Sequence, residues 1–176
     1  MIINEKLNLV VPVQSDDGDI LIGHVHSTPI SRGTFEAYYQ LVAGTFAAML
    51  RDGEGAVTAK IAELSLRRVA KDKGLQVGPF LDEIVRLTSF VKVGGEVVPF
   101  IEVVPKGVIS EDDAKDVMSI IVFFTVASAI WSKKDFRTMA PTVLAPWGAE
   151  TTSLAPTAFA ASLRTSTGDG SSGATA

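Results

Sequence analysis

The sequence predicts an α+β domain that is mainly helical, with an N-terminal β-hairpin, a short second hairpin and a C-terminal tail that carries few charges. Two stretches alternate apolar and polar residues, as half-buried strands do, whereas most of the rest repeats its apolar residues every three or four positions, as amphipathic helices do. The chain has 176 residues, of which 47% are hydrophobic. It is therefore long enough to bury a core without a metal or a disulfide.

The N-terminal hairpin is predicted from two strands that flank an Asp-rich turn. In Leu7–Val13 every second residue is apolar, and Gly18 lies in the turn that follows. Asp19–His26 supplies the second strand, which we expect to end before Pro29, because proline lacks the amide hydrogen that a sheet requires.

Three helices are expected next. The period of the first, Ser31–Gly53, is helical throughout, and the second, Val57–Lys73, ends in basic residues that complement the helix dipole before Gly74. Pro79 favours the start of a third, shorter helix. The second hairpin, Phe90–Phe100, follows, with a Gly-Gly pair suited to a tight turn.

A long helix is predicted from Ser110, which can cap it, to about Lys133. No charged residue occurs between Val117 and Trp131. A membrane span needs about 20 apolar residues, so this run indicates a buried helix rather than a membrane segment. Its apolar surface, including Phe123 and Phe124, either forms the centre of this domain or is shared with another chain.

The C-terminal part differs in composition, and we divide the chain into a core domain (residues 1–137), an interaction segment (138–163) and a flexible tail (164–176). A short helix is expected at Ala155–Leu163. Large apolar residues stand there among small, uncharged neighbours, namely Trp147, Leu154, Phe159 and Leu163. They either dock on another protein or pack back onto this protein's own core.

Candidate catalytic residues are few. There is no cysteine, and His24 and His26 are the only histidines. Both rings would project from one face of a strand, but a metal would also need carboxylates such as Asp16 or Asp19, so we interpret them as solvent-facing. The acidic run Glu111–Asp116 is interpreted as a helix start. No catalytic, cofactor or metal site is predicted.

The net charge is −4, which argues against nucleic acid as a partner, because binding to phosphates depends on many Lys and Arg side chains. The first residues lack the basic region and apolar run of a signal peptide, so we expect a cytoplasmic protein.

Several segments resemble the small tail assembly chaperones of long-tailed bacteriophages and prophages. The resemblance is carried by Val122–Ala129, Trp147–Leu154 and Phe159–Leu163. The opening strand Met1–Val13 and the helix entry Ser27–Ser31 are similar too. The likeness therefore touches most of the chain, but it includes no catalytic signature.

The resemblance implies a non-enzymatic factor in the cytoplasm of the bacterial host, which binds the tape measure protein and helps recruit tail tube subunits. It needs no cofactor, nucleic acid or membrane, and self-association stays open. The candidate partner-binding residues are Phe123, Phe124, Trp131, Trp147, Leu154, Phe159 and Leu163. The alternative is a structural virion protein, a tail or head–tail connector subunit whose hairpins pair between neighbours. A small enzyme is a third class.

Overall fold

The computed structural model describes residues 7–15 and 17–166, and it confirms the α+β class with an N-terminal hairpin. Five strands form one antiparallel sheet in the order β4-β3-β2-β1-β5. The strands are β1 (Asn8–Gln14), β2 (Leu21–Ser27), β3 (Thr88–Lys92), β4 (Val97–Pro99) and β5 (Glu150–Thr152).

Both predicted hairpins form, and they belong to the same sheet. β2 pairs with β3, with Val25 opposite Phe90, so the second hairpin extends the first. At the other edge β5 returns from the C-terminal part of the chain and pairs with the start of β1, with Asn8 opposite Thr152.

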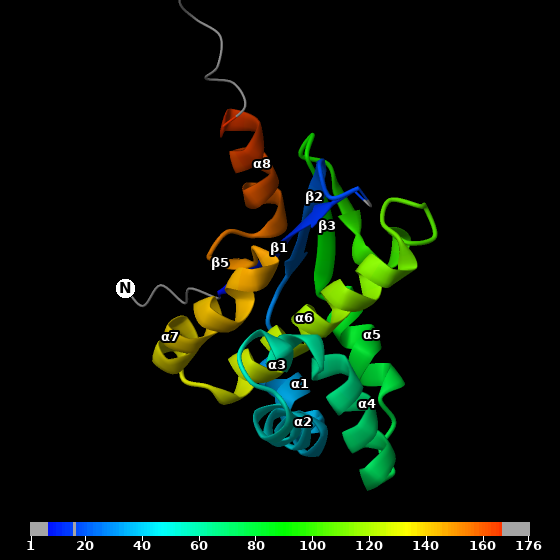
Figure 1. Cartoon of the computed structure of the whole chain (residues 1–176), viewed down its shortest axis with the longest axis vertical. Coiled ribbons are helices and arrows are strands. Elements are labelled where there is room, and N and C mark those ends of the chain that lie inside the picture. The colour runs from blue at the N-terminus through cyan, green and yellow to red at the C-terminus, as the bar shows by residue number, and fades with distance from the viewer. Residues whose placement is uncertain (1–6, 16, 167–176) are drawn as a thin grey trace, which may run out of the picture.

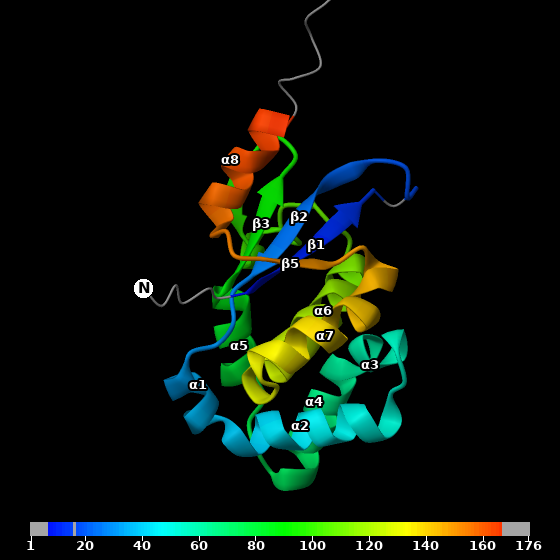
Figure 2. The ribbon, with the colours of Figure 1, turned by 90° about the vertical axis from the view of Figure 1, so that its left-hand side faces the viewer.

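Ten helical segments are described, two of them short 3₁₀ turns (η). They are α1 (Arg32–Ala37), α2 (Tyr39–Asp52), α3 (Ala56–Lys60), α4 (Ala62–Lys73), α5 (Gly78–Arg86), η1 (Phe100–Glu102), α6 (Glu111–Ile130), α7 (Lys133–Leu144), η2 (Ala145–Trp147) and α8 (Pro156–Ser166). Figure 1 and Figure 2 both show α2 and α4 at the opposite end of the molecule from α8, with the sheet and α6 between them.

The main core lies between one face of the sheet and the helices that precede α8. Leu9, Val25 and Phe90 point into it from the strands, and α6 supplies its largest contribution. The other face of the sheet carries a small separate cluster beneath α8, described below. The sheet is therefore covered on both faces.

The prediction of one helix over Ser31–Gly53 is wrong, because the chain leaves the helical conformation at Tyr38 (φ −112°, ψ 19°). Ser31 caps α1, because its Oγ accepts a hydrogen bond from the Thr34 amide. The Tyr38 ring packs against Phe80 of α5 at 5.0 Å between ring centroids. The break thus falls where a tertiary contact holds the chain.

The helix predicted over Val57–Lys73 is also interrupted, at Ile61. Backbone groups at this break are bound by Ser119 of α6, whose Oγ donates to the Lys60 carbonyl (2.7 Å) and accepts from the Glu63 amide (3.2 Å). A break in a helix is stable when another group satisfies the freed backbone. The sequence near Ile61 contains no sign of this distant serine.

The long helix α6 forms as predicted but ends at Ile130 rather than Lys133, because Ser132 caps the next helix, accepting from the Asp135 amide at 3.1 Å. The sequence analysis missed α7, which contains Pro141. The division expected after residue 137 lies inside this helix.

Two further expectations concern the ends of segments. The short C-terminal helix forms as α8 and is longer than predicted, so Arg164–Ser166, assigned to the flexible tail, are helical. The remainder of that tail, residues 167–176, lies outside the described residues. Within residues 7–15 and 17–166, no helix combines the length and apolar character needed to cross a membrane.

Candidate functional site

Three predicted partner-binding residues, Phe123, Phe124 and Trp131, are covered by this protein's own helices. Phe123 and Phe124 are 1% and 0% exposed. The Phe124 ring contacts Phe136 of α7 at 5.7 Å, and the half-buried Trp131 ring contacts Phe46 of α2 at 5.5 Å. In this conformation these side chains brace the core, and Phe123 and Phe124 are not accessible to a partner.

The other four predicted residues lie on the C-terminal segment, in two different places. Trp147 is half-buried at the end of η2, beside the main core. Leu154 is 39% exposed. Phe159 of α8 is buried against the sheet, and Leu163 of the same helix is partly buried beside it. The structure therefore does not bring the seven residues together into one surface.

Helix α8 covers the outer face of the sheet through four buried residues. Val10 of β1 and Val91 of β3 meet Phe159 and Ala160 of α8. Two imidazole rings of β2 also contact the Phe159 ring, His24 at 5.3 Å and His26 at 6.0 Å between ring centroids. The C-terminal segment is thus attached to its own sheet by a small cluster centred on one aromatic side chain.

The interpretation of the histidines as solvent-facing is wrong, although both rings do project from one face. His26 is fully buried, and its Nε2 donates to the Leu154 carbonyl at 2.8 Å. Asn8 Nδ2 donates to the same oxygen at 2.9 Å. The reason for the error is that α8 packs on this face of the sheet and covers the rings.

Burial lowers the pKa of both imidazoles below the ordinary value of 6.5. For His26 the hydrogen bond to the Leu154 carbonyl offsets part of the effect, and for His24 the charge of Glu150 does so. Among the residues that the structure describes, the Nδ1 atoms of both rings are buried and have no hydrogen-bond partner. A proton added there would be poorly solvated, which is the physical origin of the lowered values.

We expect the protein to lose stability as the pH falls from 7.5 to 5.5. Because the folded pKa values lie below 6.5, the unfolded chain binds more protons, so the contribution is fully present above about pH 6.5 and declines as the pH falls toward the folded values. Urea unfolding at the two pH values measures the loss. The variant carrying His24→Gln and His26→Gln serves as the control, and an equal loss in that variant would assign the effect to other groups.

Metal binding is not expected. Among residues 7–15 and 17–166 no three or more His, Asp or Glu side chains are grouped so that they could hold an ion. Asp16, one carboxylate considered with the histidines, lies outside the described residues. Elemental analysis of chelator-washed protein should find less than about one-tenth equivalent of zinc or nickel per chain. A stoichiometric metal that is lost in the His26→Ala variant would contradict this expectation.

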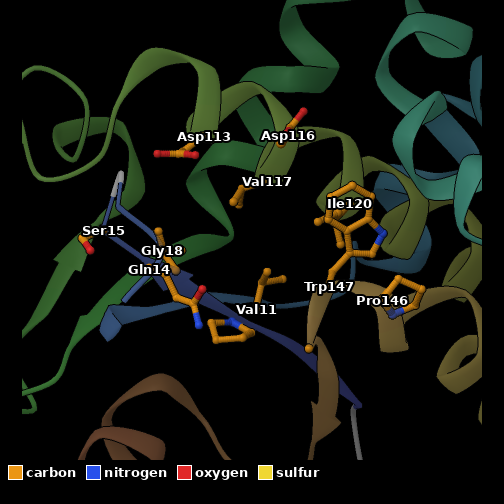
Figure 3. Close-up of a pocket in the computed structure, with 13 residues that line it drawn as sticks. Val11, Gln14, Ser15, Gly18, Asp113, Asp116, Val117, Ile120, Pro146 and Trp147 are labelled. Atoms are coloured by element: carbon orange, nitrogen blue, oxygen red, sulfur yellow. The ribbon is translucent and has the colours of Figure 1, made fainter. Parts of the chain in front are cut away.

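A groove opens between β1 and α6, beside Trp147, and encloses about 450 Å³. Figure 3 shows Val117 and Ile120 of α6 on one side, Val11 of β1 on the other and Trp147 at one end. Ser15 and Gly18 of the hairpin turn close the opposite end. The complete lining set is Val11, Pro12, Val13, Gln14, Ser15, Gly18, Asp113, Asp116, Val117, Ile120, Pro146, Trp147 and Gly148.

This groove exists because β5 covers only part of β1. The pairing between the two strands extends only to Val10 and Glu150. Just before Glu150 the chain turns at Gly148 (φ +61°), so it approaches β1 from the side and does not follow it further. A Cβ at position 148 would lie 3.1 Å from the Pro12 ring, so glycine also permits this close approach. Sequence analysis found Trp147 but missed the groove, because a three-residue strand gives almost no periodic signal.

Comparison with known proteins gives no relative for this chain: no family model, no curated protein and no solved structure matches it. The surfaces described above are a small apolar interface beneath α8 and a groove with a mixed polar and apolar lining beside Trp147.

Proposed function

We propose that the protein is a non-enzymatic tail assembly chaperone of a long-tailed bacteriophage or prophage, which binds the tape measure protein and helps recruit tail tube subunits in the cytoplasm of the bacterial host. The proposal combines the resemblance of several segments with the surfaces that the fold provides. It assigns the protein to binding rather than to catalysis.

The observation that carries the proposal is the attachment of α8. Its apolar contact with the sheet is a cluster of four buried residues, separate from the main core. Burial of its one phenylalanine contributes about 1.5–3 kcal/mol, to which the burial of Val10 and Val91 adds, so the attachment of α8 is weaker than the packing of the much larger main core. Its departure would free Phe159 and Val91 for a partner while the main core stays folded.

The edges of the sheet support a discrete factor rather than a subunit that assembles through its strands. Both edge strands, β4 and β5, have three residues, and β4 ends in Pro99. Pro12 lies in β1 beyond the last pairing with β5. Short edges and prolines oppose the addition of a neighbouring strand. This observation favours the chaperone over a tail or connector subunit.

Co-expression tests the proposal. The full chain is tagged and expressed together with the proteins encoded beside it, and the purified complexes are identified by mass spectrometry. We expect recovery of a long tape measure protein, and the tube protein in the presence of the tape measure protein. Failure to recover either from a co-expression in which both are produced would overturn the proposal.

The behaviour of the purified chain separates the two structural classes. We expect a monomer or a small oligomer by size-exclusion chromatography with light scattering. Negative-stain electron microscopy should show no regular assemblies. Rings or tubes formed by this chain alone would favour the structural virion protein instead.

A further inference from the structure

We propose that the groove between β1 and α6 is a docking site for a segment of another protein that carries basic and apolar side chains together. This inference goes beyond the proposed role in tail assembly, because it concerns the chemistry of one surface and holds for a partner of any origin.

The lining of the groove is suited to apolar side chains. Its floor consists of Val11 from β1 and of Val117 and Ile120 from α6, which are buried core residues. The apolar surface that a partner can reach belongs to the half-buried Pro12 and Trp147 and the exposed Pro146, with the Trp147 ring at one end of the groove (Figure 3). Aromatic and aliphatic side chains in a concave surface are typical anchors for a docked segment, since each contributes a large contact area.

The charges at the groove are all of one sign. Asp113 and Asp116 line it, and no lining residue is basic. In the described part of the chain neither carboxylate forms an ion pair, although Asp113 accepts a hydrogen bond from Ser110 Oγ at 2.7 Å. The exposed Asp17 and Asp19 flank Gly18 and add to the negative potential. A lysine or arginine is the complementary side chain.

This charge pattern argues against two other occupants. A second copy of the chain has a net charge of −4 and would bring repulsion rather than complementarity. Residues 167–176 of the same chain contain no basic residue and one acidic residue, Asp169, so they also lack the complementary charge. A basic segment of a different protein satisfies both the apolar lining and the carboxylates.

The strand edge indicates how the segment is held. Beyond Val10, β1 has no neighbour on the side of β5, but Pro12 supplies no amide hydrogen there. The register between β1 and β2 also shifts between Val13 and Gln14. Regular pairing of a partner strand would meet both irregularities, so the docked segment is held by its side chains rather than as an added strand.

Peptide binding to the full chain tests the inference. The probe is a fluorescein-labelled ten-residue peptide in which leucine and lysine alternate, and its affinity is measured by fluorescence anisotropy at physiological salt. Two other peptides replace lysine by glutamate or leucine by serine. We expect binding of the first peptide only, because the groove requires both charge and apolar contact.

Two variants on one helix separate the groove from general charge attraction. Asp116→Lys should lower the affinity for the leucine–lysine peptide by about tenfold. Asp112→Lys makes the same charge change on α6, but Asp112 does not line the groove and is paired with Lys115. It should change the affinity by less than about twofold. Equal weakening by the two variants would overturn the inference.

Photo-crosslinking locates the bound peptide. A benzoylphenylalanine at position 14, where the exposed Gln14 lines the groove, should crosslink to the leucine–lysine peptide, and the same group at the exposed Leu64 on α4 should not. Crosslinks from position 14 to a second copy of this chain, or equal crosslinking from position 64, would contradict the assignment.

Discussion

Replacement of Phe124 by aspartate is expected to abolish the folded protein. The side chain is 0% exposed at the centre of α6 and contacts Phe136 edge-on. Burial of an unpaired carboxylate costs several kcal/mol, in addition to about 3–5 kcal/mol for the lost aromatic packing. The sum approaches or exceeds the typical stability of a domain, about 5–15 kcal/mol. Loss of the cooperative thermal transition, followed by circular dichroism, is the measurement.

The same substitution at Leu64 on α4 provides a matched control. Leu64 is 69% exposed, so aspartate there removes little buried surface and leaves the charge in water. We expect the Leu64→Asp variant to retain its melting transition within a few degrees. A soluble Phe124→Asp variant with an unchanged melting temperature would show that α6 is not central to stability.

Removal of α8 is expected to lower the free energy of unfolding by about 3 kcal/mol while the secondary structure of the remaining domain persists. Truncation after Ala155 removes the whole helix and keeps β5. It uncovers Val10, Val91 and the His26 ring, because Phe159 no longer packs against them. Urea unfolding measures the loss, and increased binding of an apolar dye reports the exposed sheet face.

Two controls isolate the contact of Phe159. Truncation after Ser166 removes only residues outside the described part of the chain, and we expect it to leave the stability unchanged. Phe159→Ala should account for most of the loss caused by removing α8, whereas Leu154→Ala should have a small effect, because Leu154 is 39% exposed and its carbonyl is retained. Equal stability of the two truncated forms would show that α8 contributes nothing to the domain.

Much of the fold was predictable because its signals are local. The alternation in β1, the Gly-Gly turn after β3 and the Ser110 cap of α6 each depend on neighbouring residues. The breaks at Tyr38 and Ile61 were not predictable, since they are stabilised by Phe80 and Ser119 from distant elements. Local propensity yields to such contacts when the core or a backbone hydrogen bond depends on them.

The candidate sites were predicted less well, for the same reason. The sequence singled out Trp147 and Phe159 as large apolar residues in a small-residue background, and the structure places Trp147 in the groove and Phe159 between α8 and the sheet. It did not separate these two places. It also grouped with them Phe123 and Phe124, which are inside the core.

By itself, the sequence determined the α+β class, the two hairpins and the buried character of α6, because periodicity and the absence of charge act through local geometry and transfer from water. Only the tertiary structure decided that the hairpins share one sheet, that β5 completes it beside Asn8, and that α8 buries the histidines. These outcomes depend on which surfaces meet after folding. That choice is made by the packing of segments far apart in the sequence, such as Ser27 and Thr88, separated by 61 positions, and His26 and Leu154, separated by 128 positions.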